Sequence, residues 1–183
     1  MMDEKYLQSI PHIDEIAHRG VFSGVPEKIT DTFQNRSREK NKLLPSLEDA
    51  IRATGLRDGM TISFHHHFRG GDHVVNKVVD TLARMGFKNL TLAASSLAAV
   101  HAPLVEHIKN GVITHIETSG LRGELAEQVS RGLMDCPVVF RSHGGRAAAI
   151  RSGELHIDVA FLGAPSCDPY GNANGYSREE GGT

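Results

Sequence analysis

The stretch "MTISFHHHFRGGDHVVNKVVDTLARMG", residues 60–86, sets the pattern that the rest of the chain repeats. It opens with a β-type run that ends at Phe64 and continues through a loop rich in histidine and glycine. Its valines are then spaced as on one face of a helix, and Gly86 follows the last periodic residue, as glycine often does at a helix end. A strand, a polar loop and a helix in this order make the first half of a βαβ unit.

The same alternation continues downstream. Further strand-like apolar runs are centred near Leu92, Ile113, Val139 and Val159. Their spacing of roughly 20 to 30 residues is typical of successive βαβ units. The nearly continuous apolar runs "VVF" and "VAFL" favour a parallel sheet covered on both faces.

Helical patterns separate these strands. Ser46 is a good N-cap for a first helix that Gly55 would end, and Asp49 supplies an acidic variant of the capping box. Further helices are expected over residues 73–85, 98–110, 124–133 and 145–152. We therefore expect an α/β protein with a three-layer α/β/α domain and a mainly parallel sheet over residues 46–183. Residues 1–45 are interpreted as an N-terminal arm or extended segment.

Composition excludes several classes of function. The chain has 183 residues and a formal net charge of -2, so it lacks the positive footprint of a nucleic-acid-binding protein. It has no apolar run of the roughly 20 residues that cross a bilayer, and its first residues do not form an apolar secretion signal. The two cysteines, Cys136 and Cys167, are too few for a disulfide framework or a four-cysteine zinc site. We expect a cytoplasmic protein that does not act at a membrane.

The loops that follow the strands carry small, glycine-rich and basic residues. Ligands of open parallel sheets bind at this carboxyl edge, where glycines allow close approach and helix N-termini offer N–H groups. Arginines beside glycine pairs, as at Arg69 and Arg146, indicate an anionic ligand. Neither the Walker pattern nor G-x-G-x-x-G is present, which weakens nucleotide interpretations. The candidate binding residues at this edge are His65, His67, Ser95, Ser96, Ser119, Gly120, Arg122, His143, Gly144, Gly145, Arg146 and Ser166.

The histidine run leaves three interpretations open. His65 and His67 would share one side of an extended backbone, whereas His66 would not. They could contact a substrate, be merely packed or solvated, or hold a metal for hydrolysis. The metal interpretation lacks the further ligands that zinc requires, and the H-x-E pattern ending at Glu117 lacks its Pro-Cys-x-x-Cys partner. We expect no metal. No G-x-S-x-G turn surrounds any of the candidate serines, so a hydrolase nucleophile is not expected either.

Four longer stretches carry a resemblance to a known family. They read "DGMTISFHHHFRGGD", "MGFKNLTLAASSL", "HAPLVEHIKNGVITHIETSGLRGELAEQVSRGL" and "SHGGRAAAIRSGELHIDVAFLGAPSCDPYGNANGYS". Together they resemble the N-terminal part of the citrate lyase alpha subunit, the citrate CoA-transferase component of bacterial citrate lyase. The match runs over residues 45–177 in order and spacing, with a further segment at residues 11–15.

The resemblance implies a fold, an activity and partners. The fold would be CoA-transferase-like, with this chain forming the first of two such domains and stopping before the second. The activity would convert acetyl carrier and citrate to citryl carrier and acetate, through a mixed anhydride. The partners would be the beta subunit, which cleaves citryl carrier, and the gamma subunit, an acyl carrier protein with a dephospho-CoA-type group; acetyl-CoA is the related donor. No cofactor would be bound tightly on this subunit, and a multi-subunit oligomeric complex is implied.

The resemblance also implies roles for particular residues. Phe68, Arg69, Gly70 and Gly71 match the glycine-rich catalytic loop, where backbone N–H groups would stabilise an oxyanion. The segment that follows Asp168 is similar to the family's acyl-binding loop and adds Asn172 and Asn174 to the binding residues. On this view the chain alone would bind part of the ligand without turnover. A non-catalytic acyl-CoA or sugar-phosphate binding domain on the same fold is the alternative.

Overall fold

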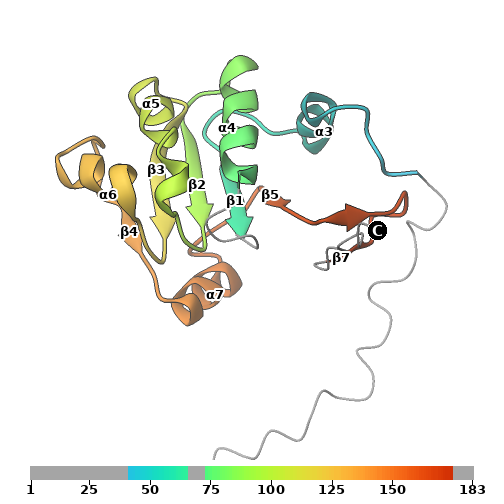
Figure 1. Cartoon of the computed structure of the whole chain (residues 1–183). Coiled ribbons are helices and arrows are strands. Elements are labelled where there is room, and N and C mark those ends of the chain that lie inside the picture. The colour runs from blue at the N-terminus through green and yellow to red at the C-terminus, as the bar shows by residue number, and fades with distance from the viewer. Residues whose placement is uncertain (1–40, 66–72, 175–183) are drawn as a thin grey trace, which may run out of the picture. The chain divides into compact units, whose positions relative to one another are not determined.

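The computed structural model describes residues 41–65 and 73–174 of the chain. Its centre is a five-stranded sheet in the order β4-β3-β2-β1-β5, and every neighbouring pair of strands is parallel (Figure 1). The predicted α/β fold with a parallel sheet is therefore confirmed. The strands are β1 (Thr61–His65), β2 (Leu90–Ala94), β3 (Ile113–Thr118), β4 (Val139–Phe140) and β5 (Val159–Leu162).

The order of the strands decides where the helices lie. The chain moves across the sheet from β1 to β4 and then returns to the far side of β1 to form β5. Right-handed crossovers therefore place the helix before β5 on the face opposite to the earlier ones. The helices are α3 (Leu47–Thr54), α4 (Val74–Arg84), the short 3₁₀ helix η2 (Ala99–His101), α5 (Leu104–Lys109), α6 (Gly123–Ser130) and α7 (His143–Ser152).

The two faces of the sheet differ in chemistry. Ile62, Leu92 and Ile116 are paired across β1, β2 and β3, are almost completely buried, and belong to the main core with residues of α3, α4, α5 and α6. The side chains next along each strand point to the opposite face, where Ala93 packs against Ala149 of α7. Only the first face is strongly apolar, because the other carries small or polar residues on the same three strands.

The outer strands differ from the expectation of burial on both faces. Phe140 in β4 is 59% exposed and Leu162 in β5 is 71% exposed. In the described part of the chain, the apolar runs that predicted strands covered on both faces therefore form the two edge strands of the sheet, β4 and β5.

The helix boundaries follow local chemistry. Ser46 caps α3 by accepting the N–H of Asp49, and Gly55 ends it in the left-handed conformation, as predicted. The expected helix over residues 98–110 is divided into η2 and α5, with Pro103 between them. Proline has no N–H to donate, so it suits the start of a helix and not its interior. The helix expected over residues 145–152 begins earlier, at His143, because the Ser142 hydroxyl accepts the N–H of Gly145.

The remaining elements form a small hairpin after β5. Strands β6 (Ser166–Cys167) and β7 (Ala173–Asn174) pair antiparallel, and Lys42 donates its N–H to the Pro169 carbonyl within the turn. Among the described residues, no helix combines the length and apolar character that a membrane crossing requires. The predicted boundary at residue 45 stays a prediction, because residues 1–40 lie outside the described part of the chain.

Gly123, the first residue of α6, is expected to be intolerant of any side chain. Its φ is +67°, and an added Cβ would lie 2.8 Å from the Cβ and 2.9 Å from the Cα of Ala99. We predict that Gly123→Ala lowers the free energy of unfolding by about 2–3 kcal/mol, from strain at positive φ plus the overlap. Gly132→Ala is the matched control, since its φ is +90° and nothing lies within 4 Å of an added Cβ. It should cost only about 1 kcal/mol in denaturant titration. Equal losses would show that the contact with Ala99 is unimportant.

Candidate functional site

A line of polar side chains crosses the carboxyl edge of the sheet. Ser63, Ala93 and Glu117 are paired across β1, β2 and β3 and point toward α7. Because side chains alternate along a strand, the residues two positions later return to the same face. Those residues are His65, Ser95 and Ser119. The Ser95 N–H donates to the Phe64 carbonyl and the Ser119 N–H donates to the Ser95 carbonyl, so the strand pairing continues to this point.

Helix α7 covers this line and closes a hollow of about 220 Å³ beneath its first turns. The helix contributes His143, Arg146, Ala147 and Ile150, whose spacing of three, four and seven residues puts them on one side of a helix. Hydroxyl, imidazole and guanidinium groups, which the sequence predicted for this edge, therefore lie together. The full lining is His65, Ser95, Ser119, His143, Arg146, Ala147 and Ile150.

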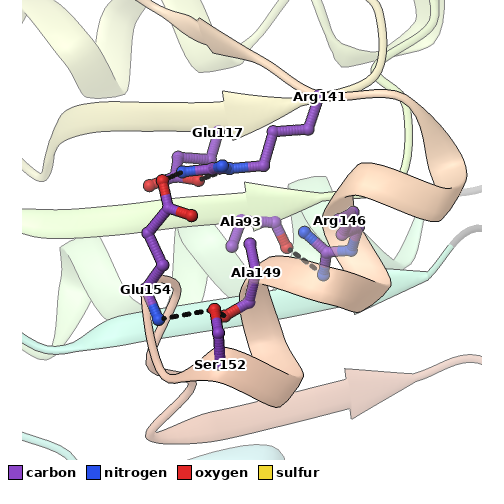
Figure 2. Close-up of polar contacts among 7 residues, drawn as sticks. All are labelled: Ala93, Glu117, Arg141, Arg146, Ala149, Ser152 and Glu154. Carbon is purple, nitrogen blue, oxygen red and sulfur yellow. Dashed lines mark hydrogen bonds and ion pairs between the residues drawn. The ribbon is translucent and has the colours of Figure 1, made fainter.

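Arg146 is the one positive charge of fixed sign in this lining. Its Nη2 donates to the Ala93 carbonyl at 3.2 Å (Figure 2). The same Nη2 donates to the Ser63 hydroxyl at 2.9 Å, so the guanidinium lies across β1 and β2. In the described part of the chain it forms no ion pair. Burial lowers the pKa of Arg146 from its ordinary value, against a smaller opposing influence of Glu117. A guanidinium withdrawn from water and bonded only to neutral oxygens favours the arrival of an anion.

Ser119 adds an unused hydroxyl to the same hollow. Its Oγ is buried and has no hydrogen-bonding partner among the described residues. A buried polar atom without a partner costs free energy, and a ligand oxygen can satisfy it. Together with Arg146, this hydroxyl gives the hollow two donors for a small oxyanion.

The size of the hollow limits the ligand class. At about 220 Å³ it is smaller than the roughly 300–1,000 Å³ typical of sites for drug-sized ligands. Arg146 and Ser119 suit a carboxylate, while Ala147 and Ile150 offer a short apolar wall. A small carboxylic acid, or one acidic arm of a larger acid, fits this chemistry best.

A larger depression of about 760 Å³ lies between α3 and α4. Most of its charged groups already have partners, since Arg84 pairs with Glu48 at 3.1 Å and Asp80 with His107 at 2.6 Å. The smaller hollow is the better candidate because Arg146 forms no ion pair among the described residues and because its position matches the ligand edge of a parallel sheet.

A charged network supports the roof of this hollow. Arg141 follows β4 and donates its Nε to Glu117 of β3 at 2.7 Å and its Nη2 to Glu154 at 3.0 Å (Figure 2). Hydrogen bonds first to Glu117 and then to Glu154 raise the pKa of Arg141. Arg141 precedes the N-cap Ser142 of α7 and Glu154 follows its C-cap Gly153, so the network ties both ends of α7 to the sheet.

The structure brings five of the predicted binding residues into one hollow: His65, Ser95, Ser119, His143 and Arg146. It places others nearby but outside the lining. Arg122 is exposed as the N-cap of α6, and Gly120 lies close to Ser96, since a Cβ added at Gly120 would be 3.9 Å from the Ser96 Oγ. Gly144 and Gly145 belong to the first turn of α7 and not to a loop. Of the arginines predicted to meet an anion, Arg146 lines the hollow and Arg122 does not, and Arg69 lies outside the described residues.

Three candidates belong to the hairpin. Ser166 is exposed in β6, Asn172 lies in the turn and Asn174 lies in β7. Asp168 holds this turn, because its carboxylate accepts the N–H groups of Tyr170 and Asn172 and the side-chain amide of Asn172, at 2.7–2.9 Å. In this structure Asp168 and Asn172 bond to each other, which assigns them a structural role in the turn.

The predicted catalytic loop cannot be placed. His67, Phe68, Arg69, Gly70 and Gly71 lie outside the described residues, so their roles stay predictions. Within residues 41–65 and 73–174, no group of three or more histidine, cysteine, aspartate or glutamate side chains could hold a metal ion.

Sequence reasoning missed the supporting residues Glu117, Arg141 and Glu154 and the apolar residues Ala147 and Ile150. A signal for two of them was present. Glu117 lies on β3, two positions before Ser119, which follows the end of that strand, and Ile150 lies seven positions after His143 on the same helix. The pairing of Arg141 with both carboxylates had no sequence signal, because it joins β3, the end of β4 and the loop after α7.

Comparisons with known proteins agree on one family. The family model described as "Citrate lyase, alpha subunit" matches residues 40–181. The citrate lyase alpha chain of Escherichia coli is 64% identical over 146 residues, which cover 80% of this chain and 29% of that protein. That of Haemophilus influenzae is 60% identical over 161 residues, covering 88% of this chain and 32% of that protein. This chain therefore spans about a third of the length of these relatives.

A solved structure gives the same result. It is the putative alpha subunit of citrate lyase from Streptococcus mutans, in complex with citrate, with a TM-score of 0.74 and 58% sequence identity. The match covers 78% of this chain and 28% of the other. These matches favour the predicted citrate lyase component over the alternative of a non-catalytic binding domain.

The turn held by Asp168 should weaken in acid. Its hydrogen bonds, first to the Asn172 side chain, lower the pKa of Asp168 from the ordinary value of 3.8. For a lowered pKa, the stabilisation is complete above the ordinary value and is lost as the pH falls through the folded-state value. We predict that the Asn172 amide exchanges faster with solvent in Asp168→Asn than in the unaltered chain at neutral pH. This difference should disappear well below pH 3.8 in NMR exchange measurements; a difference that is constant with pH would contradict the assignment.

Proposed function

The chain belongs to the citrate lyase alpha subunit family, and from this premise we propose that it supplies the citrate CoA-transferase activity of a citrate lyase. The reaction would exchange acetyl for citryl on an acyl-carrier thioester. The observation that carries this proposal is the partly buried guanidinium of Arg146, which faces a small hollow and, among the described residues, forms no ion pair with a carboxylate. The citrate complex of the Streptococcus mutans relative supports a tricarboxylate as the acceptor.

The exchange would proceed in two steps. A citrate carboxylate oxygen attacks the thioester carbonyl of acetyl carrier, a C–O bond forms, and the C–S bond breaks to release the carrier thiolate. The product is a mixed anhydride of acetate and citrate. The thiolate then attacks the citryl carbonyl of the anhydride, forming citryl carrier and releasing acetate. No net proton transfer or redox step is needed, so positioning and charge stabilisation can supply the catalysis.

The hollow would hold a carboxylate of citrate during these steps. The guanidinium fork of Arg146 pairs with two carboxylate oxygens, and the Ser119 hydroxyl donates to one of them. His65 and His143 lie at the same hollow and can donate to a second acidic group. Residues 68–71, which are expected to stabilise the oxyanion of each tetrahedral intermediate, come shortly after β1 in the sequence.

Partners follow from the same proposal. The chain would act with a beta subunit that cleaves citryl carrier and a gamma subunit that carries the dephospho-CoA-type thiol, and it would hold no cofactor tightly itself. The cytoplasm is the proposed location, since a reducing compartment suits the free thiols of Cys136 and Cys167.

The exchange itself is the first test. Acetyl carrier and citrate are supplied to this chain alone and to this sequence joined to the remaining part of a citrate lyase alpha chain. We expect citrate-dependent release of acetate from the joined protein, with citryl carrier formed in equal amount. Mass spectrometry of the carrier gives both quantities. Release of acetate at the same rate without citrate would indicate hydrolysis and contradict the proposal.

Arg146 should be needed for binding of citrate. We predict that Arg146→Gln raises the Kd for citrate at least about tenfold, because a charge-assisted hydrogen-bonded contact is lost. Arg151→Gln is the matched control: it removes the same charge from an exposed position in the last turn of the same helix. It should bind citrate nearly as the unaltered chain does in titration calorimetry. Equal effects of the two substitutions would show that only net charge matters and would remove Arg146 from the site.

A further inference from the structure

Glu117 lies near two arginines, Arg141 and Arg146, and is bonded to the first of them. Its carboxylate accepts from Arg141 at 2.7 Å, and its side chain is only 18% exposed. On the neighbouring strand, Ala93 is paired with Glu117, and the carbonyl of Ala93 accepts from Arg146. The side chain of Glu117 on β3 therefore lies on the face of the sheet that α7 covers, one strand away from the Ala93 carbonyl that Arg146 contacts. The Glu117 carboxylate is bonded to Arg141 (Figure 2).

In this arrangement the Glu117 carboxylate can compete with a ligand carboxylate for the Arg146 guanidinium. Arg146 is partly withdrawn from water, and Glu117 is the carboxylate that acts on its charge. A carboxylate paired with a guanidinium in a poorly hydrated site forms a strong bond. If Glu117 turned to Arg146, it would satisfy the group that the hollow offers to a ligand. An internal carboxylate and a substrate carboxylate cannot both occupy the same fork.

Arg141 is placed to prevent that turn. Its Nε holds Glu117 and its Nη2 holds Glu154, so two carboxylates fix its guanidinium plane. Its backbone is also fixed, because its N–H donates to the Thr118 carbonyl and extends the pairing of β4 with β3. The network thus has charges that alternate in sign from Glu154 through Arg141 and Glu117 to Arg146.

We propose that Arg141 is a positioning residue that holds Glu117 away from Arg146 and so keeps the Arg146 guanidinium available to a carboxylate ligand. The inference rests on the proposed function for the identity of that ligand, citrate. It assigns Arg141 no contact with the substrate. It assigns Glu154 the task of fixing the second half of the Arg141 fork.

The test is a rescue experiment on the full chain with citrate as the titrant. Arg141→Gln should raise the Kd for citrate about tenfold, because Glu117 is released to pair with Arg146. The double variant Arg141→Gln with Glu117→Gln should bind within about threefold of the unaltered chain, since the competing charge is gone. A merely structural role for Arg141 would leave the double variant at least as weak as the single one, and that result would overturn the inference. So would an unchanged Kd in Arg141→Gln.

A second readout needs no ligand. The NMR signal of the Arg146 Nε–H group should move in Arg141→Gln, as Glu117 pairs with it, and return in the double variant. If this signal behaves as expected while the unaltered chain fails to bind citrate, the competition for Arg146 stands and the proposed substrate is wrong. If the unaltered chain binds citrate and the signal does not move in Arg141→Gln, the proposed function stands and the inference is wrong.

A milder variant covers the case in which Arg141→Gln does not fold. Glu154→Gln removes one of the two partners of Arg141 at a side chain that is 63% exposed, so the fold should tolerate it. It should weaken citrate binding about threefold, and adding Glu117→Gln should restore it. Binding that stays weakened after the second substitution would contradict the inference in this background as well.

Discussion

The Arg146 guanidinium can lie on the sheet only because the row of side chains below it is small. Ser63 and Ala93 occupy the two central strands of that row, and they leave the space that a longer side chain would fill. The same small residues let α7 approach closely enough for Ala149 to pack against Ala93. A helix held this close to a polar sheet face forms the roof of a small hollow and carries its cation into it.

Partial burial of Arg146 strengthens the interaction that its guanidinium can make with an anion. On an open surface a guanidinium is hydrated, and its pairing with a carboxylate contributes little. Beneath α7 its hydration is partly replaced by two neutral oxygens, which do not balance its charge. In the proposed function, a bound carboxylate would offset the free-energy cost of partly desolvating Arg146, and this would strengthen the binding of that carboxylate.

The division of the sheet into an apolar face and a polar face separates stability from function. Ile62, Leu92 and Ile116 bury their side chains in the main core with residues of α3 to α6, and burial of this core stabilises the fold. The side chains on the opposite face of the same strands do not take part in this core. They provide the hydroxyls, an imidazole and the carboxylate near Arg146, and the ion pairs of Arg141 add to the packing of Ala149 on Ala93 in holding α7 on the sheet.

Much of this was predictable from the sequence alone, because local patterns determine it. The spacing of apolar runs predicted the parallel sheet, and Ser46 and Gly55 predicted the ends of α3. The polar segments after the strands predicted a group of candidate residues at the carboxyl edge, of which His65, Ser95, Ser119, His143 and Arg146 share one hollow. The tertiary structure alone decided which of the edge residues meet: it brought Arg146 beneath the helix, left Arg122 exposed and joined Arg141 to Glu117. Such contacts depend on strand order and on the return of the chain through α7. No local pattern of residues contains that order, since it arises only when segments distant in the sequence pack together.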